Sequence, residues 1–332
     1  MRGRVLVTIG LLAVAAAALT AQATMNQVVL ATGETDVNRL PPVYEASQMA
    51  PLTVGAFTSG YDKKQLFVRR AGGNFFTRGP EYRLNPSVDL GALLTESLTT
   101  QGKAMGLKLA SAGQSGWQLS GSIRDVYLES RQIPYGATLF YGYLDTDIQV
   151  SGPGGAKHTA RVRLHNYCGG YNAGMGRRDE AESCAAQLLI EGAQELLARL
   201  NRTHFKAAPQ TAMGSKLTAL SAASVDKQLA SVRAIGLSGL PDATAALLTL
   251  LPSVKSESGR GVVIEALASL GSASAVGPLS ARYATEDEDP RWYTLKAMDY
   301  IGGDEAMKFV AASGVKDKDT GPKRLADRIV KK

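Results

Sequence analysis

The sequence has few of the residues that build metal sites and nucleophilic active sites. Its 332 residues include 2 cysteines and 3 histidines. His158 and His165 are an odd number of residues apart on one expected strand, so they point to opposite faces and do not share a metal. His204 stands apart, near a helix end. No Ser/His/Asp or Cys/His spacing indicates a nucleophile, so we expect no catalytic residue, no metal and no cofactor.

Dense basic runs interleaved with aromatic residues are also absent, although the net charge is +7. We therefore expect no nucleic-acid partner. The long apolar run, residues 5–19, is shorter than the roughly 20 residues that span a bilayer.

That apolar run has the surroundings of a secretory signal peptide. Arg2 and Arg4 precede it, and the small-residue site Ala21-Gln22-Ala23 follows it. We expect residues 1–23 to be removed after Ala23, with a retained anchor as the alternative. No cysteine follows Ala23, so the lipid attachment of bacterial lipoproteins is not expected. The predicted location is periplasmic or secreted, with membrane association only through partners or an uncleaved signal.

The two cysteines predict a disulfide. Cys168 ends an expected strand and Cys184 lies in the first turns of the following helix. In an exported protein such a pair is usually oxidised, and closing this loop stabilises the fold by roughly 3 kcal/mol on the chain-entropy model.

Residues 51–205 predict an α+β domain. A strand follows Pro51, a helix begins near Val88, strand alternation recurs between residues 117 and 167, and a long amphipathic helix begins at Asp179 or Glu180. We expect an antiparallel meander with helices on one sheet face, preceded by a linker or extended arm at residues 24–50. This order resembles bacterial envelope auxiliary lipoproteins of the YajG and LptE-like groups, apart from the missing lipid cysteine.

One face of the meander is a candidate binding surface. Tyr141, Tyr143, Asp145 and Asp147 alternate along the middle strand and therefore share a face. They form either a polar, aromatic binding face or the solvent side of an antiparallel sheet.

The second half of the chain contains an internal repeat. The segments 233–239, 265–271 and 296–302 share one pattern, and their marker alanines Ala234, Ala266 and Ala297 are 32 and 31 residues apart. Each unit predicts two amphipathic helices, the first closed by a glycine. The pattern resembles HEAT-type repeats of the PBS-lyase HEAT-like variety, which implies an all-α repeat domain over 224–332 that contacts proteins. Residues 206–223 are expected to form a linker or a partial first repeat.

These features predict a non-enzymatic, exported scaffold protein of the bacterial cell envelope, with protein partners bound by the helical repeat. The alternative is a small-ligand or glycan binder that uses the α+β domain. A hydrolase using the glycine-rich stretch 169–178 with Asp145 and Asp147 is less favoured.

Overall fold

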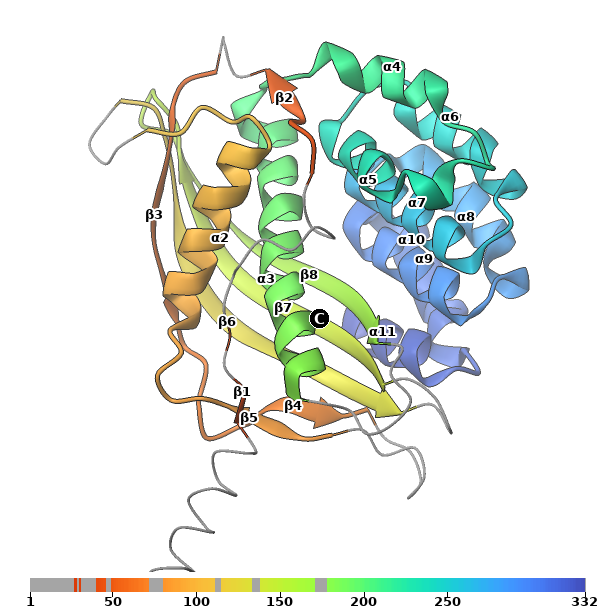
Figure 1. Cartoon of the computed structure of the whole chain (residues 1–332), viewed down its shortest axis with the longest axis horizontal. Helices are drawn as coiled ribbons and strands as arrows, with labels where there is room; N and C mark the ends of the chain where they lie inside the picture. Colours follow the sequence, from red (N-terminus) through yellow and green to blue (C-terminus); the bar gives the residue numbers. More distant parts are fainter. Residues whose placement is uncertain are drawn as a thin grey trace, which may run out of the picture.

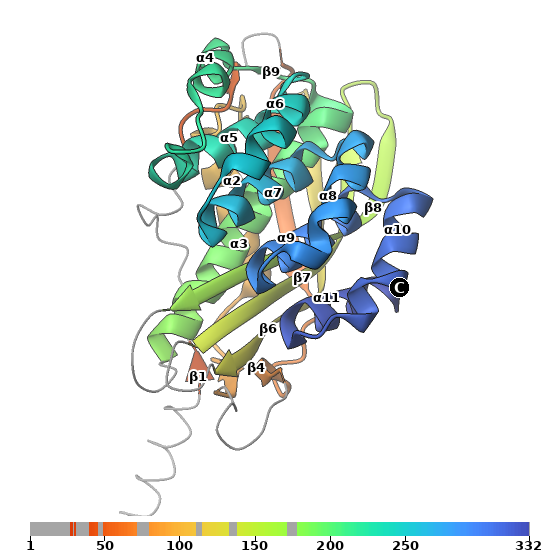
Figure 2. The same cartoon turned by 90° about the vertical axis from the view of Figure 1, so that its right-hand side faces the viewer.

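The computed structural model describes residues 27–28, 30, 40–45, 49–71, 80–110, 115–132, 138–170 and 178–331. The expected signal peptide lies outside these ranges. α2 and α3 lie against one face of a twisted sheet, and the C-terminal helices lie beside α3 and along one edge of the sheet (Figures 1 and 2).

The meander has the predicted order. β6 (Trp117–Gln132), β7 (Thr138–Ser151) and β8 (Lys157–Gly170) pair antiparallel along their lengths. The rest of the sheet is mixed, because β3 (Leu52–Ser59) and β4 (Leu66–Arg70) both pair in parallel with β6. β5 (Tyr82–Leu84) pairs antiparallel with β4, and β1 (Gln27–Val28) pairs in parallel with β5.

One face of the sheet packs against two helices, α2 (Leu90–Ala104) and α3 (Arg178–Leu200). The side chain of Asp89 caps α2 by accepting a hydrogen bond from the amide of Ala92. Alternate residues of β7, such as Phe140 and Leu144, are buried in the core on this side. The period-two alternation of the sequence thus corresponds to the two faces of β7.

The expectation that helices cover only one sheet face is wrong. Tyr141 and Tyr143, on the opposite face, are each 1% exposed because the C-terminal helices pack over them. The ring centroid of Tyr141 lies 6.2 Å from that of Trp292 in the helical layer. An aromatic face can be buried in this way because a second amphipathic layer supplies apolar partners.

The helical layer consists of paired helices at the predicted period. The pairs are α5 (Leu229–Ser238) with α6 (Ala243–Leu250), α7 (Glu257–Leu270) with α8 (Val276–Arg282), and α9 (Glu288–Ile301) with α10 (Gly303–Ala312), and α11 (Thr320–Val330) follows. Gly239, Gly271 and Gly302 follow the first helices with positive φ of 71°, 65° and 70°, as their closing role requires. That these helix pairs belong to the HEAT type of repeat is still a prediction from the sequence.

Short helical segments complete this layer. A π-helical turn, Asn201–Phe205, continues α3. Single 3₁₀ turns adjoin the later helices at Val225–Lys227, Leu251–Ser253, Ala273–Ala275, Tyr283–Thr285 and Gly314–Lys316.

Strands of the expected linker or arm at residues 24–50 and of the expected linker or partial repeat at residues 206–223 pair with each other. β2 (Tyr44–Glu45), from residues 24–50, pairs antiparallel with β9 (Ala208–Pro209), from residues 206–223. The hydroxyl of Tyr44 donates a 2.5 Å hydrogen bond to the carbonyl of Leu237 in α5. Residues 206–223 also contain the helix α4 (Thr211–Ala219). These segments therefore connect the sheet to the helical layer.

Candidate functional site between the sheet and the C-terminal helix

A charged pocket of ≈ 620 Å³ lies where α11 meets the exposed part of the meander. Its size is in the usual range for small-molecule sites. α11 packs there because Leu325, Ala326 and Ile329 are buried on one side of the helix, which leaves its arginines beside the pocket. The residues around it are Arg124, Asp125, Tyr127, Glu129, Tyr143, Asp145, Arg161, Arg163, Arg324, Asp327, Arg328 and Lys331.

Two carboxylates of the pocket are neutralised by arginines. Asp145 accepts hydrogen bonds from Nε and Nη2 of Arg161 at 2.9 and 2.5 Å. Glu129 accepts a 2.6 Å bond from Nε of Arg324 and a second from its Nη2. These bonds raise the pKa of both arginines. The α11 pair ties the last helix to β6 with two-pronged geometry.

Two tyrosines lie beside a third arginine of the pocket. The guanidinium carbon of Arg328 lies 4.9 Å from the ring centroid of Tyr127 and 4.6 Å from that of Tyr143. Burial raises the pKa of both hydroxyls, so both tyrosines are neutral at physiological pH. The stacking positions the arginine by cation–π attraction.

A second polar cluster lies deeper, between α3 and the helical layer. The Lys296 ammonium, fully buried, donates to Glu195 at 2.6 Å and to Glu265 at 2.8 Å. Arg233 donates to Glu191 at 2.7 Å. Burial alone would lower the pKa of Lys296, but the two carboxylates outweigh it and hold the pKa well above its usual value. The cluster joins three repeat helices to α3.

His165 of β8 extends this cluster toward α9. Its Nε2 lies 2.9 Å from Oδ2 of Asp299, and its backbone amide donates to the hydroxyl of Tyr300, which in turn donates to Glu195. Burial is the main cause that lowers the pKa of His165. The imidazole is therefore a neutral, interior link between the sheet and the helices.

The outer surface carries an apolar groove of ≈ 600 Å³ between α4 and α6. Leu217 and Leu220 contribute one side, and Leu247 and Leu250 the other. The exposed methyl group of Ala245 also lines it.

The structure separates the four predicted face residues. Tyr143 and Asp145 line the charged pocket. Tyr141 is buried, and its hydroxyl donates to Glu288 at 3.3 Å. Asp147 is half-buried and pairs with Arg124 at 3.0 Å on the neighbouring strand. Only part of this face is thus available to a ligand.

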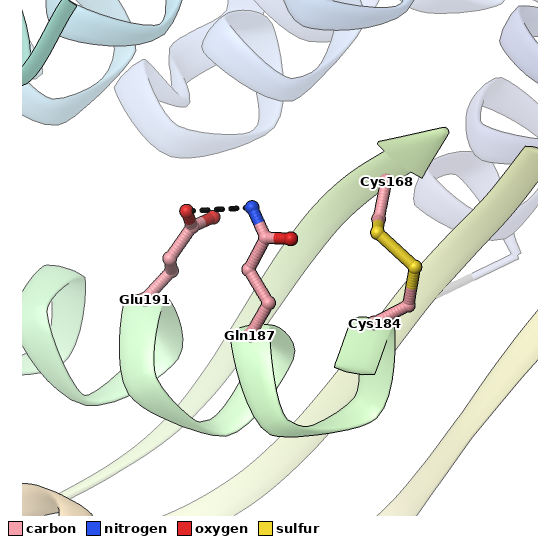
Figure 3. Close-up of a disulfide and its surroundings, with 4 residues drawn as sticks. All are labelled: Cys168, Cys184, Gln187 and Glu191. Atoms are coloured by element: carbon pink, nitrogen blue, oxygen red, sulfur yellow. Dashed lines mark hydrogen bonds between the residues drawn. A yellow bond between two sulfur atoms is a disulfide. The ribbon is translucent and has the colours of Figure 1, made fainter. Parts of the chain in front are cut away.

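Cys168 and Cys184 form the predicted disulfide, with their Cα atoms 5.7 Å apart. The bond joins the end of β8 to the first turns of α3, one turn before the hydrogen-bonded pair of Gln187 and Glu191 (Figure 3). It therefore fixes the helix that carries the acidic half of the interior cluster. Most of the glycine-rich stretch, residues 171–177, lies outside the described residues.

Sequence reasoning did not identify the interior cluster or the pocket. The signal for the cluster was present, because Arg233, Glu265 and Lys296 each directly precede a marker alanine. The pocket had no such signal, since its two walls lie far apart in the chain. Within the described ranges, no group of three or more His, Cys, Asp or Glu residues could hold a metal. No helix of the described chain has the length and apolar character needed to cross a membrane.

No family model matches the sequence, and no curated protein matches it. Three solved structures are similar to about half of the chain, consistent with its N-terminal part. A Xanthomonas campestris protein of the family DUF330 is 10% identical, covers 48% of this chain and 88% of its own, and has a TM-score of 0.35. An uncharacterised protein is 12% identical, covers 48% of this chain and 99% of its own, and has a TM-score of 0.29.

The third structure is rare lipoprotein B from Shewanella oneidensis. It is 11% identical, covers 46% of this chain and 95% of its own, and has a TM-score of 0.26. All three similarities leave the function of this chain open.

Proposed function

We propose that the protein is an exported, non-enzymatic interaction protein of the bacterial cell envelope whose HEAT-like helical layer binds a partner protein. The observation that carries the proposal is the apolar groove between α4 and α6. Export is supported by the sequence features of residues 1–23 and by the disulfide, which is typical of oxidising compartments.

The inner side of the helical layer is already occupied. Glu191 and Glu195 of α3 bind Arg233 of α5 and Lys296 of α9, and β7 packs against Trp292 of α9. A partner protein that binds this layer must therefore contact its outer helices or the end formed by α4.

One position of the groove is apolar in the first pair and polar in the other pairs. Leu250 is partly exposed in α6, and the residues at the same place in the next two units are Arg282 and Ser313. Together with Leu217 and Leu220 of the same groove, Leu250 forms a continuous apolar surface of the kind that contacts partners.

The occupant that fits this groove is an amphipathic helix of another protein. Leucines on both sides offer apolar contacts, and the small side chains of Ala245 and Ala246 between them allow close approach. This is the helix-in-groove mode of recognition.

Two matched alanines test the proposal. Ala245 in the groove and Ala311 on α10 are both exposed and helical. A photo-crosslinking residue placed at position 245 in living cells should capture one defined envelope protein that position 311 does not capture. Ala245→Arg should abolish co-purification of that protein, and Ala311→Arg should leave it unchanged.

Equal capture at both positions, or equal loss in both variants, would overturn the groove assignment. A crosslink between two copies of this chain, with sedimentation showing a dimer, would replace the partner protein with self-association. Far-UV circular dichroism of both arginine variants verifies that they are folded.

A further inference from the structure

We propose that the pocket between the meander and α11 binds a ligand that carries a phosphate group. This site is separate from the α4–α6 groove, and it gives the α+β half of the molecule a binding role of its own. The argument rests on the charges that line the pocket and on how few of its cations are already paired.

The carboxylates of the pocket are largely neutralised. Asp145 is paired with Arg161 and Glu129 with Arg324. Asp125 lies 3.7 Å from Arg69, outside the pocket. Asp327 is the remaining acid, and the described residues supply no ion-pair or hydrogen-bond partner for its side chain.

Three cations of the pocket lack a carboxylate partner in the described part of the chain: Arg163, Arg328 and Lys331. Arg163 projects from β8, and the other two come from α11. Asp327 is the single unpaired acid among the described pocket residues, so these three cations give the pocket between the meander and α11 an excess of positive charge. An anion entering the pocket would meet these groups without first breaking an ion pair.

Arg328 is held in place by its neighbours but still has an N–H group without a hydrogen-bond partner in the described part of the chain. Arg328 stacks on Tyr127 and Tyr143 and donates from Nη1 to the hydroxyl of Tyr127. Its Nε is buried and has no hydrogen-bond partner among the described residues. A buried N–H without an acceptor costs free energy, so the hydrogen-bonding capacity of this guanidinium is not fully used by the described part of the protein.

These features favour a phosphate group over a single carboxylate. A phosphate offers several acceptor oxygens and up to two negative charges, and guanidinium groups bind it through paired hydrogen bonds. The pocket is also larger than a phosphate ion, so a polar body attached to the phosphate has room. A soluble phosphorylated metabolite and a phospholipid headgroup share this chemistry.

The test compares probes that differ by one phosphate. Isothermal titration calorimetry of the mature full chain should detect saturable binding of glycerol phosphate and no binding of glycerol. Vesicles of phosphatidylcholine with and without phosphatidic acid form the second arm. Preference for the soluble probe identifies a metabolite site, and preference for phosphatidic acid vesicles identifies a headgroup site.

Charge-matched variants locate the binding. Arg163→Gln with Lys331→Gln should weaken binding of the phosphate probe about tenfold or more. Arg83→Gln with Lys308→Gln removes the same charge from exposed positions elsewhere and should change binding by less than about twofold.

Two results would overturn the proposal: no preference for either phosphate-bearing probe over its counterpart, or an equal loss of binding in both double variants. Because Lys331 is exposed near the chain end, the single variant Lys331→Gln keeps the test decisive if Arg163→Gln does not fold.

Discussion

The ammonium nitrogen of Lys296 lies 2.8 Å from Oε1 of Glu265, and these two residues hold the same place in consecutive units of the repeat. Arg233 holds that place in the preceding unit, and its Nε lies 3.7 Å from Oε2 of Glu265. The charges therefore alternate along α5, α7 and α9. Glu191 and Glu195 of α3 bind the two cations. This row of alternating charges, the charge ladder, therefore aligns the three repeat helices with one another and also attaches them to α3.

Replacing the central cation should destabilise the whole molecule. In Lys296→Met, Glu265 and Glu195 remain buried after losing their main cation, which we expect to lower the free energy of unfolding by about 3–5 kcal/mol. Urea denaturation followed by circular dichroism measures this change.

Lys308 provides the control, because it is exposed on α10. Lys308→Met should alter stability by less than about 0.5 kcal/mol. If the two variants unfolded at the same urea concentration, the ladder would not contribute to the stability of the fold.

Asp289 should make the stability depend on pH. Burial raises its pKa to about 6, the carboxylates of Glu257, Glu288 and Asp287 add to the effect, and a hydrogen bond from Tyr167 opposes it. The unfolded value is about 3.9, so between these values the folded state binds more protons. The contribution of Asp289 to stability is therefore present at low pH and is lost as pH rises through about 6.

Asp289→Asn removes this titration. The variant should be more stable than the natural chain by roughly 3 kcal/mol at neutral pH and nearly equal to it near pH 4. Urea unfolding at several pH values gives the difference directly. A difference that stayed constant over this range would contradict the assignment.

Local patterns in the sequence were sufficient to predict much of the fold. Alternation along residues 139–150 indicated the strand β7, and the Ala-to-Gly spacing located α5, α7 and α9 with their closing glycines. Such periodicities depend on near neighbours in the chain, so one sequence reveals them.

The arrangement of the layers could not be predicted in this way. Nothing near Tyr141 in the sequence shows that Trp292 will cover it, and nothing near Arg163 shows that Arg328 will face the same pocket. These contacts depend on how two long segments pack, which is settled by the summed burial of many side chains. The strands β2 and β9 are only two residues long, too short to show an alternation in the sequence. The sequence therefore predicts only a linker or extended arm at residues 24–50 and a linker or partial first repeat at residues 206–223.

Loss of the disulfide should weaken the attachment of α3 to the sheet. We expect Cys168→Ala with Cys184→Ala to lower stability by about 3 kcal/mol, because the closed loop restricts the unfolded chain. Thermal unfolding of the natural chain with and without a reducing agent, beside the double variant, measures the effect. Two titratable thiols in unreduced protein from the periplasm, or no change in the melting midpoint, would contradict a structural bond.

The last prediction concerns the contact between α5 and α7, on which the repeat interpretation depends. A Cβ atom built at Gly236 of α5 would lie 2.6 Å from Cα of Ala266 and 2.8 Å from its carbonyl oxygen. Gly236→Ala should therefore force the two helices apart and cost about 1–3 kcal/mol. Gly214 in α4 is also helical, but a Cβ there would meet nothing within 4 Å.

Gly214→Ala should accordingly stabilise the protein by about 0.4–1 kcal/mol, since alanine restricts the unfolded chain more than glycine does. The same substitution thus has opposite signs at two helical positions, and a difference in helix propensity cannot produce that result. Differential scanning calorimetry of the two variants is the measurement. If both variants gained stability, the marker alanine of the second unit would not lie against the first unit, and the stacked arrangement of the repeat would lose its main support.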